Sequence, residues 1–290
     1  MTSVATAWLV YRLSDSEFML GLSFFCSQFP SFILGPVGGV IVDRSDRRRI
    51  FLITQALSML QSLALGIGAL SGYASIELVL ALALFQGFVN AFDLPARTSF
   101  LSDLVPDRYD LANAIALNSG MFNLARPIGP AIAGLLIPYT GESWCFMVDA
   151  ASYLPVLVIL GMLPSVATPP PRSARLPLLT EIQDGMQYAF GNSTIRTILG
   201  VVATLSFFGM QYATLMPAIA KEMFGGGPSL LGILMSVGGA GSFVGAALLA
   251  VRRSVTDLPK LIPAGMIIVG AAVLALALSP TALTAAPWVF

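Results

Sequence analysis

Long apolar runs separated by short polar segments dominate the chain. A helix that crosses the hydrocarbon core of a bilayer needs roughly 20 consecutive, mostly apolar residues. Runs of about that length lie at 18–42, 50–70, 76–92, 112–138, 144–163, 197–219, 229–251 and 261–279. The pattern therefore predicts an all-α integral membrane protein with about eight full spans.

Shorter apolar runs lie at the two ends of the chain. Residues 1–11 (MTSVATAWLVY) are apolar but about half a span long, and residues 287–290 (PWVF) begin another run. We interpret these segments as a partial first span and the beginning of a tenth. On this interpretation the chain is truncated at both ends relative to a larger helix bundle.

The longest polar segment divides the chain into two parts. Residues 164–193 include Thr168-Pro169-Pro170-Pro171-Arg172, a composition that favours extended polyproline geometry over helix. After it, apolar residues recur at helical spacing between acids, which predicts a short interfacial helix. We expect a transmembrane half at 1–163, a linker with a short amphipathic helix at 164–196, and part of a second transmembrane half at 197–290.

Basic residues predict the orientation of these spans. Twelve of the fifteen Lys and Arg residues lie in alternate loops. Positively charged loops are retained on the cytoplasmic side, so the loops near Arg47, Pro106, Pro170 and Arg253 are expected to be cytoplasmic.

Composition narrows the possible functions. The chain is 56% hydrophobic and 10% charged, whereas roughly a quarter of the residues of a soluble globule are charged. Lys plus Arg equals Asp plus Glu at fifteen each, there is no His, and there are two Cys. This composition supports neither a nucleic-acid partner nor a His-ligated metal site, and we expect no cofactor and no metal. The expected partner is the lipid bilayer.

One loop carries a recognisable charge pattern. Gly39, Asp43, Arg44, Arg47 and Arg48 match the spacing of the loop signature of the major facilitator superfamily, which this chain resembles, and Asp46 stands where that family has Gly. From charge alone, a solvated anchor loop and a conformational latch fit equally well. The resemblance implies a latch that stabilises one facing state.

A second resemblance covers about sixty residues. The segments 92–97 (FDLPAR), 103–106 (DLVP), 113–118 (NAIALN) and 122–126 (FNLAR) resemble the enterobactin-exporter-like, or transmembrane secretion effector, branch of that superfamily. The predicted fifth span also carries an antiporter-type pattern of small residues, at Ala125, Gly129, Pro130, Ala133 and Gly134. Generic close packing of helices would give the same pattern.

The resemblance implies a fold of two six-helix halves with a substrate site between them. It also implies secondary-active efflux of small organic molecules, siderophore-like or drug-like, by alternating access across a bacterial inner membrane. Proton-coupled antiport would drive it. The expected partners are thus a small-molecule substrate and a coupling proton; the oligomeric state is not predicted.

Arg126 is the main candidate for substrate contact. A cation deep in a span is costly and should face a partner or water, and Asn118 and Asn123 lie one to two turns before it. We expect Arg126, Asn118 and Asn123 to line a cavity for an anionic or strongly polar substrate. The alternative is a structural pair between Arg126 and an acid.

Asp149 is the candidate for proton coupling. It is the one acid predicted to lie inside a span, and burial raises a carboxyl group's affinity for protons. Among other functions, an inactive truncated transporter fragment remains open. A channel or a membrane-embedded enzyme is disfavoured, because the chain offers neither a continuous polar stripe nor converging nucleophile, base or metal ligands.

Overall fold

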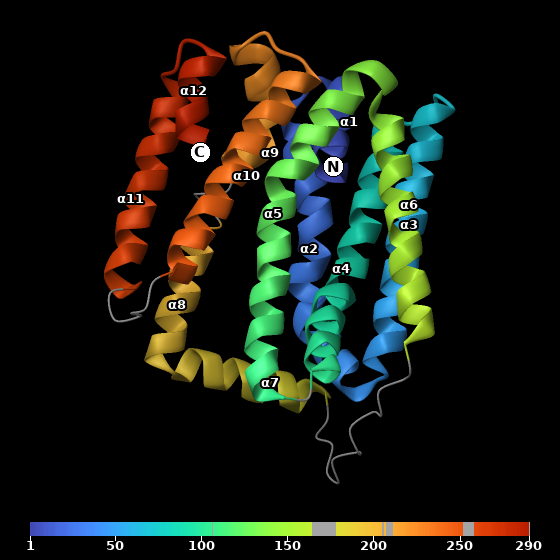
Figure 1. Ribbon diagram of the computed structural model, residues 1–290, viewed down its shortest axis with the longest axis vertical. Coiled ribbons are helices and arrows are strands. Elements are labelled where there is room, and N and C mark those ends of the chain that lie inside the picture. The colour runs from blue at the N-terminus through green and yellow to red at the C-terminus, as the bar shows by residue number, and fades with distance from the viewer. Residues whose placement is uncertain (106, 164–177, 205, 207–210, 252–257, 290) are drawn as a thin grey trace. The chain divides into compact units, whose positions relative to one another are not determined.

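A computed structural model describes residues 1–105, 107–163, 178–204, 206, 211–251 and 258–289. Every regular element in these ranges is a helix (Figure 1), which confirms the predicted all-α class. The elements are α1 Thr2–Ser14, α2 Glu17–Arg44, α3 Arg47–Leu70, α4 Ile76–Leu104, α5 Arg108–Thr140, α6 Glu142–Met162, α7 Leu178–Gly191, α8 Ser193–Thr204, α9 Gln211–Ala218, the π-helical turn η2 Ile219–Met223, α10 Pro228–Val251, α11 Leu258–Ala277 and α12 Ala282–Val289.

Six helices are long and apolar enough to cross a membrane: α2, α3, α4, α5, α6 and α10. The predicted count of eight full spans is not confirmed. The predicted span at 197–219 falls on α8, α9 and η2, with 205 and 207–210 outside the described residues. The predicted span at 261–279 falls on α11, whose described apolar part is Gly265–Ala277. Predicted to end at residue 92, α4 instead continues to Leu104 through a more polar segment.

Local sequence explains several helix ends. Asp46 precedes α3 with extended backbone, and its carboxylate accepts a hydrogen bond from the Arg49 amide at 3.1 Å. Ser75 caps α4 in the same way, accepting from the Leu78 amide at 3.3 Å. Side-chain oxygens at this position satisfy amides that have no partner inside the helix. Gly141, with φ 78°, follows α5 in the left-handed conformation that glycine adopts without strain.

The contacts within the chain define two compact units. Unit 1 comprises Met1–Gly21, Ala116–Cys145 and Val201–Phe290; unit 2 comprises Leu22–Ile115 and Phe146–Gly200. The predicted division into sequence halves at 163 and 197 stays a prediction. The predicted cytoplasmic loops at Pro106, Pro170 and Arg253 lie outside the described residues.

In unit 2, α3 and α4 form the most extensive helix pair. Helix α2 packs on α4 at Gly87, where an added Cβ would lie 2.8 Å from the Ser27 carbonyl oxygen, and Ser31 Oγ donates to the Gly87 carbonyl at 2.8 Å. Helix α6 packs on α3 at Gly66, where a Cβ would meet the Met147 sulfur at 2.8 Å. Glycines thus let these backbones approach closely, as is common between membrane helices.

In unit 1, α5 and α10 are in backbone contact. A Cβ at Gly134 would lie 2.7 Å from the Gly232 Cα, and a Cβ at Gly239 would lie 2.6 Å from the Pro127 nitrogen. Helix α1 contacts α9 and α10, and α12 contacts α10 and α11. This close α5–α10 contact positions the cavity described below.

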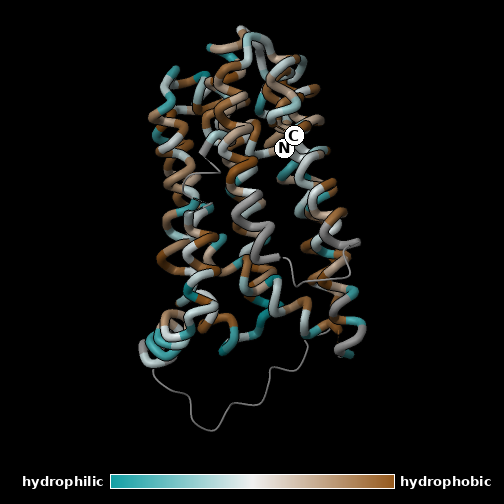
Figure 2. Tube along the Cα trace, turned by 90° about the vertical axis from the view of Figure 1, so that its left-hand side faces the viewer, coloured by the Kyte–Doolittle hydropathy of each residue, from teal (hydrophilic) through white to brown (hydrophobic). Residues whose placement is uncertain are grey.

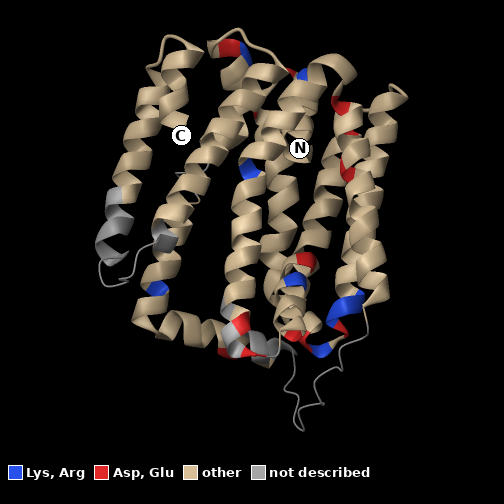
Figure 3. Ribbon diagram, in the orientation of Figure 1, with Lys and Arg blue, Asp and Glu red and all other residues tan. Residues whose placement is uncertain are grey.

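Charge and hydropathy are distributed as a membrane protein requires. Apolar residues predominate along the long helices (Figure 2), and charged residues gather near the helix ends and are sparse in between (Figure 3). A charge within the hydrocarbon core must face a partner, a cavity or water. The few charges within the helices are therefore the residues to examine for function.

The α5–α10 contact can be tested with two glycines on one helix. We expect Gly232→Ala to lower the unfolding free energy by about 1–3 kcal/mol, because its methyl group meets Gly134 and the Pro130 carbonyl. Gly245→Ala is the matched control, since a Cβ there meets nothing within 4 Å. Thermal unfolding in detergent measures both variants, and equal stability would contradict the close contact.

Candidate functional site

Unit 1 contains a cavity of about 410 Å³. Helices α5, α9 and α10 contribute most of the lining residues, and the wall is largely apolar. The lining residues are Met1, Ser3, Phe122, Ala125, Arg126, Gly129, Pro130, Tyr212, Ala213, Met216, Met235, Gly238, Gly239, Ser242 and Val289. The volume is within the range of about 300–1,000 Å³ that small-molecule sites occupy.

Helix α5 presents one face to this cavity. Phe122, Ala125, Arg126, Gly129 and Pro130 recur at three- and four-residue intervals, which places them on one side of a helix. Arg126 is the charged side chain of that face. Among the described residues, none forms a hydrogen bond or ion pair with its guanidinium group. A structural pair with an acid, the alternative interpretation, therefore finds no partner in the described part of the chain.

Three residues, Arg126, Asn118 and Asn123, are predicted from the sequence to line a cavity. The structure places Arg126 among the lining residues of this cavity. Asn118 lies one turn before Phe122 on the same helical row but is not among the lining residues. Asn123 is turned toward its own helix, where its amide donates to the Ser119 carbonyl at 2.9 Å. A substrate role for these two asparagines stays a prediction.

The predicted antiporter-type residues divide between two tasks. Ala125, Gly129 and Pro130 line the cavity. Ala133 is fully buried, and Gly134 lies against Gly232 of α10. The small residues therefore bring two backbones together beside the cavity.

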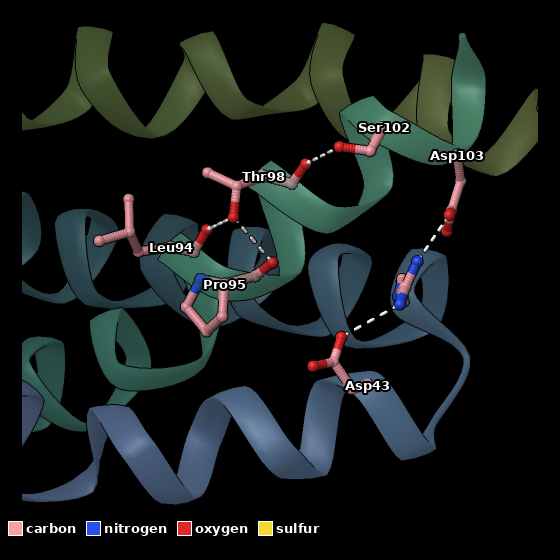
Figure 4. A network of polar contacts seen from close by, with 7 residues as sticks. Asp43, Leu94, Pro95, Thr98, Ser102 and Asp103 are labelled. Atoms are coloured by element: carbon pink, nitrogen blue, oxygen red, sulfur yellow. Dashed lines mark hydrogen bonds and ion pairs between the residues drawn. The ribbon is translucent and has the colours of Figure 1, made fainter. Parts of the chain in front are cut away.

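The predicted loop residues form an ionic network in unit 2. Arg47 Nη1 lies 2.6 Å from Asp103 Oδ1 of α4, and Arg47 Nη2 lies 3.0 Å from Asp43 Oδ1 of α2. Figure 4 shows the two carboxylates on either side of the shared guanidinium. Nearby, Thr98 Oγ1 donates to the carbonyls of Leu94 and Pro95. The Arg47 side chain thus ties the ends of α2 and α4 to the start of α3.

Arg48 forms a different contact from Arg47. Its Nε donates to the Leu160 carbonyl at 2.6 Å and its Nη2 to the Gly161 carbonyl at 2.7 Å. These carbonyls belong to the last turn of α6, where a cation also interacts favourably with the helix dipole. Arg44 ends α2, and Gly39 has open space where a Cβ would project.

Asp149 of α6 is partly buried in unit 2. Its Oδ2 accepts a hydrogen bond from Ser62 Oγ of α3 at 2.6 Å. Ser62 belongs to a buried polar face of α3, consisting of Thr54, Gln55, Ser58, Gln61 and Ser62. Because their positions repeat about every four residues, these side chains lie on one side of the helix.

A second acid, Asp93, lies on this polar face and is not predicted from the sequence. Asp93 Oδ1 accepts hydrogen bonds from Thr54 Oγ1 and from Gln55 Nε2, both at 2.7 Å. The predicted span ends at residue 92, so Asp93 lies just outside it. The buried polar positions at 54, 55, 58, 61 and 62 within an apolar run were the available signal.

A third polar cluster, also missed, lies in unit 1. Tyr11 donates to Glu222, Lys221 Nζ lies 2.6 Å from Asp15 Oδ1, and Arg12 Nε lies 2.9 Å from Glu142 Oε1. These contacts tie the end of α1 to η2 and to the start of α6. Their sequence separations, up to 211 residues, put them beyond any local pattern.

A family model describing the transmembrane secretion effector matches residues 1–290. The chain belongs to the major facilitator superfamily. It is 29% identical over 245 residues to the staphyloferrin A transporter of Staphylococcus aureus, which covers 83% of this chain and 60% of that protein. It is 27% identical over 224 residues to the enterobactin exporter EntS of Shigella boydii, covering 77% of this chain and 52% of that protein.

A third relative in this superfamily is the uncharacterized transporter YfiS of Bacillus subtilis, 28% identical over 269 residues, or 90% of this chain and 62% of YfiS. The chain therefore spans about half to three fifths of the length of these relatives. Membership confirms the family predicted from the loop signature and the 92–126 segments, and identifies a multi-pass membrane protein with bacterial relatives.

The two acids around Arg47 are expected to differ in their contribution to stability. The side chain of Asp103 is 23% exposed and that of Asp43 is 62% exposed. Asp103→Asn should lower the unfolding free energy by about 1.5–3 kcal/mol, because a partly buried hydrogen bond between charged groups is weakened. Asp43→Asn, the matched control, should change it by less than about 1 kcal/mol. Chemical unfolding of both variants in detergent measures the difference, and a larger loss in Asp43→Asn would refute this ranking.

Proposed function

We propose that this chain forms part of a secondary-active exporter that moves small anionic organic molecules by alternating access, in antiport with protons. The observation that carries the proposal is that Arg126 lines a cavity of ligand size and has no partner among the residues that the structure describes. The proposed location is a bacterial inner membrane, with the Arg47 loop on the cytoplasmic side as the distribution of basic residues favours.

The depth of Arg126 supports an anionic ligand. At about 1.5 Å per residue, Arg126 lies about 27 Å from the start of α5 and about 21 Å from its end. A cation at that depth favours an anion that supplies the missing charge. The guanidinium group matches the geometry of a carboxylate through two parallel hydrogen bonds.

The rest of the cavity wall supports an organic substrate with apolar or aromatic parts. Phe122 and Tyr212 offer aromatic surface, and Met216 and Met235 offer flexible, polarizable side chains that adapt to ligands of differing shape. Ser3 and Ser242 add hydroxyl groups. Together with relatives named for staphyloferrin A and enterobactin, this lining favours siderophore-like compounds, and drug-like compounds second.

The Arg47 network supports the proposed latch. Helices α2, α3 and α4 are held together by one guanidinium, and Arg48 attaches the same loop to the end of α6. Contacts of this kind stabilise one arrangement of helices and must be released if the helices move apart. We infer that the loop stabilises one of the two facing states.

Asp149 is the proposed coupling carboxyl. It lies about 10 Å from the start of α6, in an apolar helix, with the Ser62 hydroxyl as its hydrogen-bond donor. Its protonation would change its interaction with α3, which offers a physical link between proton binding and helix position.

Uptake into everted membrane vesicles tests the proposal. With the vesicle interior made acidic, we expect the wild-type protein to accumulate staphyloferrin A or enterobactin. Arg126→Ala should weaken binding by about tenfold or more, because a hydrogen bond between charged groups, which contributes about 1.5 kcal/mol or more, is lost. Arg126→Lys should lose less, because it keeps the charge but not the two-pronged geometry.

Arg49→Ala is the matched control for this experiment. The Arg49 side chain is 83% exposed and pairs with Asp46, and Arg49 is not among the cavity-lining residues. The Arg49→Ala variant should therefore bind and transport the substrate like the wild type. If both Arg126 variants keep the affinity and the transport rate of the wild type, the proposed substrate role of Arg126 is wrong. If uptake does not depend on the pH gradient, the proposed antiport is wrong.

A further inference from the structure

Buried polar side chains line one face of α3 between its two ends. Thr54, Gln55, Ser58, Gln61 and Ser62 are each no more than 9% exposed, although the helix is apolar enough to span a membrane. Buried polar groups destabilise a fold unless they are hydrogen-bonded. A face of this kind is therefore retained for a structural or a functional reason.

Two carboxyl groups lie against this face, at separate levels. Asp93 bonds to Thr54 and Gln55, toward the Arg47 end of α3, and Asp149 bonds to Ser62, toward the Leu70 end. Seven to eight residues separate the two levels, or about 11 Å along the helix. Asp93 itself lies about 26 Å from the start of α4 and about 16 Å from its end.

The surroundings of Asp93 can satisfy both of its protonation states. As a carboxylate, it accepts from Thr54 Oγ1 and Gln55 Nε2. Thr54 Oγ1 also lies 2.9 Å from the Phe51 carbonyl oxygen, a second acceptor for the same hydroxyl. When Asp93 takes up a proton, Thr54 can donate to Phe51 alone and accept from the new carboxylic O–H.

Few charged groups oppose such titration. On its own helix, Arg97 lies one turn further on and favours the carboxylate. Helix α6 contributes Tyr153 and Asp149 to the titratable groups near the polar face. The two groups of α3 that donate to Asp93, Thr54 Oγ1 and Gln55 Nε2, carry no charge. The charges of α2 nearest this level are its last two residues, Asp43 and Arg44.

The middle of the polar face contains an unused acceptor. Gln86 of α4 donates through Nε2 to Ser58 Oγ at 3.0 Å and to Asn90 Oδ1 at 2.9 Å. Its Oε1 is buried and has no hydrogen-bond donor within the described part of the chain. Hydroxyls at positions 54, 58 and 62 are each about 6 Å apart along α3.

We propose that Asp93 is a second proton-binding carboxyl, lying on the same polar face of α3 as Asp149, so that unit 2 holds protons at two levels of one polar face. The inference rests on the proposed proton antiport. In each binding step a hydronium ion transfers its proton to a carboxylate oxygen and leaves as water. One negative charge is neutralised, and no electrons are transferred.

A purely structural role gives a different expectation. If Asp93 only clamps α4 to α3, then Asn at this position should behave as the wild type does, because its amide oxygen still accepts from Thr54 and Gln55. If Asp93 binds a proton, Asn removes the titrating group while leaving the clamp in place. The Asn variant therefore separates the two roles.

Infrared-monitored pH titration of the whole chain in lipid vesicles provides the test, since it detects protonated carboxyl groups without any ligand. The wild-type spectrum minus that of Asp93→Asn should contain one pH-dependent protonated-carboxyl band. The wild-type spectrum minus that of Asp149→Asn should contain a second. Asp110→Asn, which removes an exposed acid, should remove neither. Thr54→Val should shift the Asp93 band to higher pH, because the charged form loses a donor.

If the wild-type spectrum minus that of Asp93→Asn contains no protonated-carboxyl band at any pH of the titration, the inference is overturned. Vesicle uptake of staphyloferrin A separates this failure from failure of the proposed function. If uptake responds to the pH gradient but Asp93 has no titrating band, the second site is wrong and the antiport stands. If the band is present but uptake ignores the gradient, the proton site stands and the antiport is wrong.

Discussion

The cost of placing charge in a low-dielectric interior governs this molecule. A charged side chain within a membrane span must find a partner, a cavity or water, or the span is destabilised. The chain limits the problem by keeping most of its charges at the helix ends (Figure 3). The exceptions are few, and their environments differ in a way that separates structural charges from candidate functional ones.

Several charges of unit 2 are satisfied by groups within that unit, whereas Arg126 of unit 1 has no such partner among the described residues. Arg47 is shared by two carboxylates, Arg48 binds the end of α6, and Asp93 and Asp149 are hydrogen-bonded to α3. Arg126, by contrast, lines a cavity without a partner among the described residues. In a superfamily of transporters, an unmatched charge in a cavity is most simply explained as half of a ligand site.

The sequence alone predicts those features that depend on length and local periodicity. It identifies helices α2, α3 and α6 nearly to their ends, and it identifies Arg126 because a cation in an apolar run is visible without coordinates. It ends α4 twelve residues early because Asp93 interrupts the apolar run, although hydrogen bonds from α3 make that acid acceptable inside the helix. The orientation of Asn123 and the Tyr11–Glu222 contact depend on neighbouring helices, so no local pattern reveals them.

The most direct measurement is an electron cryomicroscopy map of the protein in lipid with staphyloferrin A bound. The account predicts an oxyanion of the ligand within hydrogen-bond distance of the Arg126 guanidinium, with the rest of the ligand against the aromatic and methionine wall. A map in which Arg126 pairs with an acid of the protein, or in which the ligand lies elsewhere, would contradict it.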